Sequence, residues 1–363
     1  MTFLFPLSLM LADQVQETSQ RVSEPTETTA NGNTDRSFII TPIPISDPAI
    51  GTGLGLGGMV LYKPGNSAKP WTSGLGGLYT DSASWAVAAF QKAHFADDSY
   101  RLTALAGYGI FNIDFFGIGQ DAGSRGISIG LEQEGAAALV DFLGRVRPHT
   151  YLGLRYRGAT VNTKVDTTTL PFPDLNLPAI ELESTISALG LAAEYDTRDS
   201  EYGPRKGYFA EAQWLFADEA FGSDFDYPSA TAALNGYVPV GESTTLAWRG
   251  SLCWTGDGGP FYDLCNYGSQ HDLRGYSNGQ YRDHAMFAVQ AEVRQHLFGR
   301  FGAVAFAGVG GVAPSFGDMD KLLPAAGIGL RFEASRQYRV NLSIDFAVGD
   351  DSNGFYFYVG EAF

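Results

Sequence analysis

The last nine residues carry the strongest structural signal in the sequence. Residues 355–363 are Phe-Tyr-Phe-Tyr-Val-Gly-Glu-Ala-Phe, an aromatic stretch with a period of two that finishes on phenylalanine. A period of two is typical of a β-strand. Because bilayer hydrocarbon offers no hydrogen-bond partner to an unpaired strand edge, we expect this strand to pair with the first strand and close a cylinder.

Alternating apolar and polar residues continue through most of the chain. Between residues 338 and 348 the apolar residues fall on one face, while Arg339, Asn341, Ser343 and Asp345 fall on the other. In a soluble β-sandwich the apolar face would form the core, whereas in a membrane barrel it would meet lipid and the polar face would line the lumen. The alternation alone leaves both folds open. No run of about 18 consecutive apolar residues occurs, which excludes a transmembrane helix.

Turn residues divide the alternating region into sixteen runs, separated by links of alternating length. The expected strands are 37–45, 51–63, 71–80, 84–95, 99–110, 127–143, 149–164, 183–197, 207–217, 228–240, 243–254, 282–297, 301–312, 323–333, 338–348 and 353–363. Short links such as 144–148, 298–300 and 334–337 would be periplasmic turns, and the links 111–126, 165–182 and 254–281 would be external loops. The sequence therefore predicts an all-β fold, a 16-stranded antiparallel transmembrane β-barrel over residues 37–363, in the outer membrane of a Gram-negative bacterium.

The segment before the barrel has two parts. Residues 1–12 contain an apolar stretch that resembles the core of a secretory signal peptide with cleavage after Ala12, although the basic leading segment is missing. Residues 13–36 are polar and almost without apolar anchors, so they are expected to form a disordered periplasmic tail. We therefore expect an exported protein with a single folded domain.

Composition and motifs argue against several functions. The net charge of −16 argues against a nucleic-acid partner, because phosphate binding needs a basic surface. Residues 53–58 satisfy a dinucleotide-binding glycine pattern, but no helix pattern follows them, so no cofactor is expected. Ser269, His271 and Asp272 lie too close together on one loop for a catalytic triad, and no metal-ligand spacing occurs. We expect no catalytic or metal-binding residues, and membrane lipids as partners.

The chain contains two cysteines, Cys253 and Cys265. An even number of cysteines in an exported protein is typical of a disulfide, and this pair would close the base of the longest external loop. The alternative is two unrelated thiols. We expect the disulfide.

Three segments, in order, resemble one family. They are Asp-Leu-Arg-Gly-Tyr at residues 272–276 in the longest external loop, Ala-Glu-Val-Arg at residues 291–294 in the next strand, and the terminal strand. Together they resemble the BamA/TamA superfamily of outer-membrane assembly and translocation barrels, also called bacterial surface antigens. Residues 195–208 resemble the family's periplasmic turn.

This resemblance implies a specific anchor for the long loop. In the family the loop folds back into the lumen and its arginine contacts acidic groups on the inner wall. The resemblance therefore implies that Arg274, Gly275 and Tyr276 form the anchor and that Glu292 is the partner of Arg274. The family's second acid corresponds to Gly308 here, so we expect the anchor to rest on one carboxylate instead of two.

The resemblance also implies a function. It points to a short form without the family's periplasmic polypeptide-transport-associated domains, because residues 13–36 are too few to hold one. The expected role is protein insertion or translocation, or lipid handling, with unfolded outer-membrane or secreted proteins as clients. The alternative is a passive pore or structural protein in which the infolded loop acts as a plug.

The seam between the first and last strands is expected to be weak. Pro42 and Pro44 lack backbone N–H groups and are spaced by two, so the missing donors lie on one edge of the first strand. If that edge faces the last strand, the lateral seam loses up to two hydrogen bonds. Alternatively, the prolines face the second strand or precede the paired region. The expected seam residues are Pro42, Pro44, Phe355, Phe357, Val359, Gly360 and Phe363.

Overall fold

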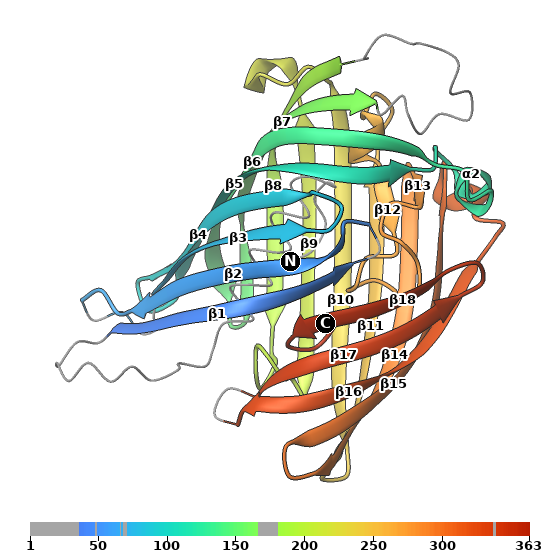
Figure 1. Cartoon of the computed structure of the whole chain (residues 1–363). Helices are drawn as coiled ribbons and strands as arrows, with labels where there is room; N and C mark the ends of the chain where they lie inside the picture. Colours follow the sequence, from blue (N-terminus) through green and yellow to red (C-terminus); the bar gives the residue numbers. More distant parts are fainter. Residues whose placement is uncertain (1–35, 48, 66, 68–70, 166–180, 337–338) are drawn as a thin grey trace.

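The chain folds as a barrel made of one continuous antiparallel sheet (Figure 1). The computed structural model describes residues 36–47, 49–65, 67, 71–165, 181–336 and 339–363. Sixteen strands form the sheet, each hydrogen-bonded to its neighbours in chain order. The predicted 16-stranded antiparallel barrel is confirmed. The expected signal segment, and the tail as far as residue 35, lie outside the described residues.

The barrel strands follow the predicted ranges closely. They are β1 (Arg36–Asp47), β2 (Gly51–Tyr62), β3 (Trp71–Thr80), β4 (Trp85–Phe95), β5 (Tyr100–Phe115), β6 (Ile129–Arg147), β7 (Thr150–Val165), β8 (Glu181–Asp196), β9 (Gly207–Ala217), β10 (Tyr227–Val240), β11 (Thr244–Thr255), β14 (Ala285–Phe298), β15 (Phe301–Ala313), β16 (Leu323–Ser335), β17 (Val340–Gly349) and β18 (Asn353–Val359).

The remaining elements lie in the links. Strands β12 (Cys265–Tyr267) and β13 (Tyr281–Asp283) pair with each other inside the long loop, and α2 (Gln120–Ser124) lies in the β5–β6 link. The single-turn helix η3 (Phe261–Asp263) also lies in the long loop, and η2 (Glu219–Phe221) and η4 (Phe316–Asp318) lie in the β9–β10 and β15–β16 links. Within the described ranges, no helix has the length and apolar character needed to cross a membrane.

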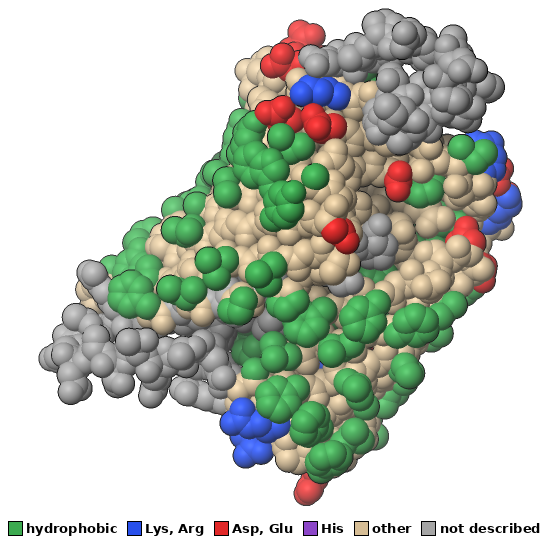
Figure 2. Space-filling model, in the orientation of Figure 1, with side chains coloured by type: hydrophobic (Ala, Val, Ile, Leu, Met, Phe, Trp, Pro, Cys, Tyr) green, Lys and Arg blue, Asp and Glu red, His purple; other side chains and the backbone are tan. Residues whose placement is uncertain are grey.

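Side chains alternate between an outer apolar face and an inner polar face. On β9, Tyr208, Trp214 and Phe216 are exposed on the outside while Phe209 and Leu215 are buried. Figure 2 shows hydrophobic side chains spread over the outer wall, with charged side chains gathered at the two ends of the barrel. This distribution suits a wall that meets hydrocarbon between two polar interfaces.

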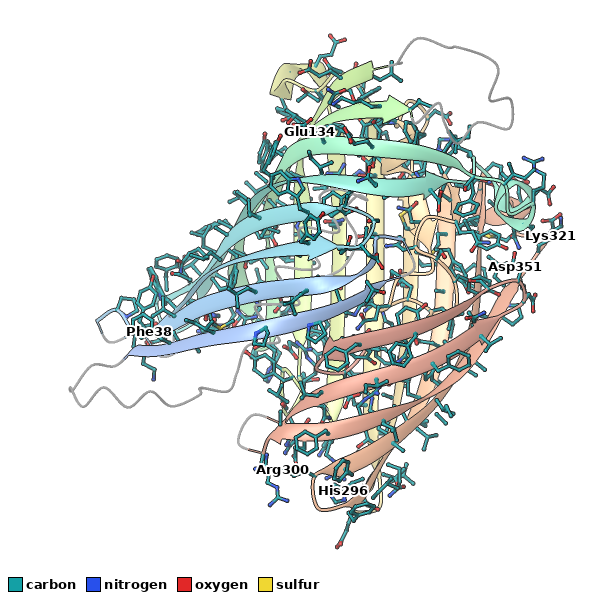
Figure 3. The ribbon with its side chains drawn as sticks, in the orientation of Figure 1. Phe38, Glu134, His296, Arg300, Lys321 and Asp351 are labelled. Atoms are coloured by element: carbon teal, nitrogen blue, oxygen red, sulfur yellow. A yellow bond between two sulfur atoms is a disulfide. The ribbon has the colours of Figure 1, made fainter. Side chains whose placement is uncertain are left out.

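The two ends of the barrel differ. The end where β1 begins and β18 finishes is called the turn end here, because most of its links are short; the other end is the loop end. In Figure 3, His296 and Arg300 mark the turn end, and Lys321 and Asp351 mark the loop end. Aromatic pairs ring the turn end, among them Trp71–Phe95, Tyr100–Phe142 and Phe301–Phe332, with ring centroids 4.7, 5.9 and 5.4 Å apart. Aromatic side chains in such a ring are typical of a membrane interface.

Two element bounds differ from the predictions in ways that matter. Strand β5 continues to Phe115, so the loop expected at 111–126 is shorter. Strand β18 stops at Val359 instead of reaching Phe363, because Gly360 adopts a φ of +99° and turns the chain away from the sheet. Such a left-handed conformation is accessible to glycine at little cost. The last three residues therefore leave the wall.

Candidate functional site: the infolded loop and the seam

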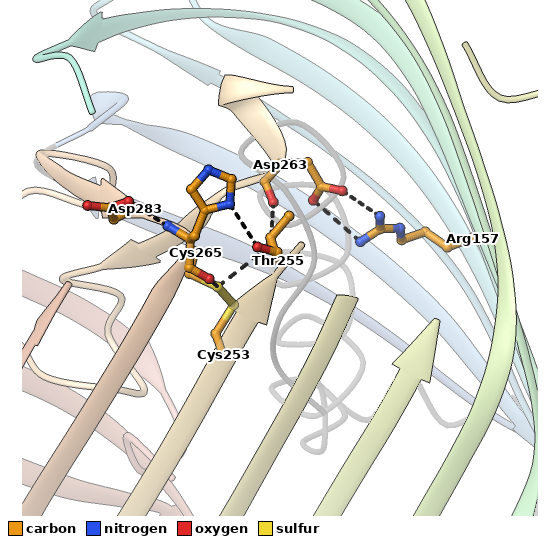
Figure 4. Close-up of a disulfide and its surroundings, with 7 residues drawn as sticks. Arg157, Cys253, Thr255, Asp263, Cys265 and Asp283 are labelled. Carbon is orange, nitrogen blue, oxygen red and sulfur yellow. Dashed lines mark hydrogen bonds and ion pairs between the residues drawn. A yellow bond between two sulfur atoms is a disulfide. The ribbon is translucent and has the colours of Figure 1, made fainter. Parts of the chain in front are cut away.

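The long loop between β11 and β14, residues 256–284, is covalently fixed at its base. Cys253 on β11 and Cys265 on β12 form a disulfide, with their Cα atoms 5.7 Å apart (Figure 4). The predicted pairing is confirmed. Thr255 next to the disulfide donates a hydrogen bond of 3.0 Å to the carbonyl oxygen of Asp263. The first part of the loop is thus held against the end of β11.

An ion pair fastens the same part of the loop to the opposite inner wall. Nη2 of Arg157 on β7 lies 2.6 Å from a carboxylate oxygen of Asp263, and the hydroxyl of Tyr227 on β10 donates to the same oxygen. Figure 4 shows Arg157 reaching across to Asp263. Burial raises the pKa of the Asp263 carboxyl to about 7, although the Arg157 guanidinium opposes the rise. We call these three residues the loop clasp.

Arg274, farther along the loop, is the centre of a second attachment on the other side of the lumen. It is fully buried, and its guanidinium forms ion pairs with Glu292 on β14 and Asp345 on β17. It also donates 3.1 Å to the hydroxyl of Tyr358 on β18, and its Cζ lies 3.6 Å from the ring centroid of Phe306. The structure thus brings Arg274 and Glu292 together, as the family resemblance implied.

The expectation of a single carboxylate was wrong. Asp345 is the second acid, supplied by β17. Gly308 on β15, where the family places its second acid, has no room for a side chain: a Cβ there would lie 2.6 Å from Cδ1 of Leu273 and 2.5 Å from the carbonyl oxygen of Val289. Because Gly308 has no side chain, the loop can approach the wall there. The second negative charge is supplied instead by Asp345 on β17, two strands away from β15.

The anchor belongs to a balanced buried network of three arginines and three carboxylates. Arg331 on β16 donates 2.5 Å to Asp345 and 2.9 Å to Glu361. Arg294 on β14 donates 2.8 Å to Glu292 and lies 3.7 Å from Glu361. With Arg274 included, each of these charges has an opposite charge beside it, which offsets the cost of desolvation. We call these six residues the anchor network.

The residues after Arg274 tie the loop to the last strand. The backbone N–H of Gly275 donates 2.9 Å to the hydroxyl of Tyr356 on β18. The hydroxyl of Tyr276 donates 2.6 Å to the carbonyl oxygen of Pro324, and its ring fills the space beside Gly349, where a Cβ would lie 2.4 Å from it. The loop anchor therefore holds β16, β17 and β18 as well as β14.

The end of the chain lies inside the barrel, which corrects the expectation that Gly360 and Phe363 form part of the seam. The N–H of Gly360 donates 2.6 Å to the carbonyl oxygen of Asn341 on β17. The carbonyl oxygen of Phe363 accepts 2.9 Å from Nη2 of Arg294, and its ring centroid lies 6.4 Å from that of Tyr237. The carboxylate of Glu361 drives this inward turn, because its arginine partners lie in the lumen.

The first and last strands lie beside each other without forming a ladder. Strand order runs from β1 to β18, and within the described residues no ladder joins these two edge strands. Figure 1 shows β1 and β18 as neighbours over a short stretch near the middle of the view, beyond which β1 continues to the left and β18 to the right. In the part of the chain that the structure describes, the expected ladder that would close the cylinder is not formed, and the barrel is nearly closed.

The prolines of β1 face this seam. Pro42 and Pro44 pair with Leu56 and Leu54 of β2, so they lie within the paired region. On β2, two residues before Leu54, Thr52 directs both its N–H and its carbonyl oxygen towards Asp81 beside β3. Residues at this spacing share the same edge. The nitrogens of Pro42 and Pro44 therefore point away from β2 and towards β18.

The same reasoning defines the edge of β18. The backbone N–H of Gly360 donates to the carbonyl oxygen of Asn341 on β17, so every second residue of β18 counted back from Gly360 turns its N–H and carbonyl groups towards β17. The intervening residues Phe355, Phe357 and Val359 therefore turn their N–H and carbonyl groups towards β1. The β1 edge of the seam thus lacks an N–H group at two positions, while the β18 edge carries both N–H and carbonyl groups. The structure thus places five of the seven expected seam residues on the two facing edges.

Several functional contacts were not predicted from the sequence. Asp345 had been placed on the lumen face but not assigned as a partner of Arg274, and Asp263 carried no signal at all. Of the loop cluster considered as catalytic, Ser269 donates 2.7 Å to Asp272, while His271 contacts the carbonyl oxygen of Ala362 instead. That arrangement is not a nucleophile–base–orienter relay.

A nearly closed 16-stranded barrel whose outer face is apolar and whose lumen is crossed by an arginine-anchored loop defines a β-barrel membrane protein. The sequence of residues 106–363 matches the model of the Omp85 superfamily domain, so the chain belongs to the Omp85 superfamily. Among curated proteins, none matches it in sequence.

The fold is similar to solved Omp85-type barrels. BamA from Haemophilus ducreyi lacking POTRA domains 1–3 aligns with a TM-score of 0.59 at 16% identity, covering 97% of this chain and 76% of that one. CdiB from Escherichia coli aligns with a TM-score of 0.61 at 13% identity, covering 95% and 68%. At these identities the likeness shows the fold.

Proposed function

We propose that this protein is an Omp85 barrel that inserts or translocates proteins at the outer membrane of a Gram-negative bacterium. The observation that carries the proposal is the seam, where β1 and β18 face each other without a ladder. The turn end would face the periplasm and the loop end the outside. Client strands, arriving from the periplasm, would meet the edge of β1.

Strand addition supplies the mechanism. An unpaired edge in hydrocarbon is costly because water cannot satisfy its polar groups. When a client strand pairs with β1, the hydrogen bonds between them satisfy the backbone N–H and carbonyl groups of both strands. Pro42 and Pro44 remove two donors from the edge of β1 that faces β18, and each missing N–H removes a bond worth about 0.5 to 1.5 kcal/mol that would otherwise hold the seam closed. The seam would therefore open to a client at lower cost than a regular ladder.

The contacts of the loop weigh against a permanently open pore, the alternative function. The loop clasp holds residues 256–284 to β7 and β10. On the other side, Arg274 of the anchor network holds the same loop to β14 and β17, and Gly275 and Tyr276 hold it to β18 and β16. The loop therefore crosses the lumen with an attachment on each side. A steady, large conductance in a planar bilayer would favour the passive pore.

In-cell photocross-linking tests the proposal. A photoreactive residue replaces Ile40 on the outer face of β1, and a matched control replaces Ile328 on β16; the two side chains are 70% and 66% exposed. We expect adducts with unfolded outer-membrane or secreted proteins at residue 40 and none at residue 328. Lipid adducts alone at residue 40 would favour lipid handling, and equal protein labelling at both positions would overturn the proposal.

A further inference from the structure

The link between β8 and β9, residues 197–206, is unusually long for the turn end. The other links there that are described throughout, 96–99, 148–149, 241–243 and 299–300, have two to four residues. A link of ten residues at this end needs a reason, because the turn geometry alone does not require it. We call this segment the crossbar.

Internal bonds hold the crossbar in one shape. Arg198 donates to both carboxylate oxygens of Asp196 at 3.0 and 2.9 Å, and its Cζ lies 4.0 Å from the ring centroid of Phe209. One carboxylate oxygen of Asp199 accepts from the backbone N–H groups of Arg205 and Lys206 at 2.9 and 3.1 Å. These internal hydrogen bonds therefore hold the crossbar in a defined conformation.

The crossbar reaches a distant hairpin. The second carboxylate oxygen of Asp199 lies 2.6 Å from Nη1 of Arg339, in the β16–β17 link. Gly203 packs against the same residue so closely that a Cβ would lie 2.4 Å from the Arg339 carbonyl oxygen. In sheet order, the strands β10, β11, β14 and β15 separate the two hairpins on one side, and eight strands separate them on the other. The contact therefore crosses the mouth of the barrel.

Contacts at two further places fix the crossbar to the turn end of the barrel. Oε1 of Glu201 lies 3.7 Å from Nζ of Lys92 on β4. Arg205 donates to the carbonyl oxygen of Glu242 in the β10–β11 link and, at 3.4 Å, to the hydroxyl of Thr245. The segment thus touches three parts of the wall besides its own hairpin, in the manner of a bar laid across an opening.

We propose that the crossbar is a gate over the turn-end mouth of the lumen and that the Asp199–Arg339 ion pair is its latch. The side chains of the pair are 32% and 43% exposed, so water and salt weaken it and the latch is easily released. The gate controls the route through the lumen. The gate does not involve the lateral seam, so a negative result in the test of the gate leaves the proposed function unaffected.

Thiol accessibility tests the gate. Thr103 lines a small lumenal cavity together with Asp141, Arg155 and Glu194, and a cysteine introduced there is the only free thiol because the native pair is a disulfide. A bulky charged methanethiosulfonate reagent is added to the purified barrel in detergent. His149→Cys, at an exposed turn, measures the intrinsic reaction rate.

The expected results distinguish an Asp199–Arg339 ion pair that controls access to the lumen from one that only stabilises the barrel. Arg339→Gln should raise the rate at position 103 about tenfold, whereas Arg339→Lys, which keeps the charge, should stay near the original rate. High salt should mimic Arg339→Gln. A barrel in which residues 200–204 are replaced by two glycines, checked for heat-modifiable mobility, should react fastest. If neither Arg339→Gln nor the shortened barrel reacts faster at position 103, the crossbar is not a gate.

Discussion

Asp345→Asn is the most informative single change, because it removes one charge from the anchor network and keeps the shape of the side chain. Asp345 is fully buried and contacts Arg274, Arg331 and Tyr358. The variant leaves three buried arginines facing two carboxylates. Removing one partner from a buried ion pair typically costs about 3 to 5 kcal/mol. Since about 1.4 kcal/mol is a factor of ten, the fraction of molecules with the loop undocked should rise by roughly 10² to 10³ or more.

Trypsin provides the assay, because the loop carries Arg274 and Arg282, both buried, as cleavage sites. When opening and closing are fast compared with cleavage, the rate of cleavage follows the population of the undocked loop. The matched control is Glu132→Gln, whose ion pair with Lys164 spans 3.3 Å between side chains that are 38% and 35% exposed. Such an exposed pair is worth at most about 1 kcal/mol. Equal cleavage rates in the two variants would refute the buried anchor.

Three further changes test the loop and its supports. Reduction of the Cys253–Cys265 disulfide should lower stability by about 3 kcal/mol, seen as a lower temperature for the heat-induced mobility shift; an unchanged temperature would contradict this. Burial places the folded pKa of Asp263 at about 7, above its ordinary 3.8, so its stabilising contribution is complete below pH 3.8 and is lost as pH rises through 7. The rate at which trypsin cleaves the loop, divided at each pH by its rate on an unfolded reference peptide, should rise across that range, and Asp263→Asn should remove the rise; a pH-independent ratio in the unmodified protein would contradict it. Gly308→Asp should loosen the loop although it restores the family's acid, because the new Cβ collides with Leu273; tighter docking in the trypsin assay would show that the site has room.

The wall of the barrel was predictable because its signal is local. Each strand alternates with a period of two, and the structure reproduces the predicted bounds of β3 and β9 at both ends. The same local pattern misled at the end of the chain. Residues 360–363 continue the aromatic alternation, but Glu361 finds Arg331 and Arg294 in the lumen, and these long-range ion pairs outweigh the strand pattern.

The candidate site was predictable only where a family motif marked it. Arg274 and Glu292 lie in recognisable segments, whereas Asp345 joins them from 71 positions away with no motif of its own. The crossbar contact between Asp199 and Arg339 spans 140 positions. Contacts of this kind depend on which strands the barrel brings together, and the periodicity of single strands does not contain that information.

The position of the prolines was the most open question at the level of sequence, and the structure answers its geometric part. Their nitrogens face β18. The prolines pair with Leu56 and Leu54 of β2, and Thr52, two residues before Leu54, bonds to Asp81 on the side of β3 and not to β1. Three alternatives had been considered, and backbone parity selects one.

Locking the seam tests the central claim most directly. A single cysteine at residue 38, 39 or 41, which leaves residue 40 for the photoreactive residue, is paired with a cysteine at 357–359 of β18, and a short bis-maleimide joins them irreversibly; the native disulfide leaves no competing thiol. The control is a pair across β15 and β16, at Ala305 and Ile328, which already face each other in a ladder. The account predicts that the seam lock abolishes client cross-linking at residue 40 while the control lock does not. Undiminished client cross-linking in a barrel with a locked seam would contradict it.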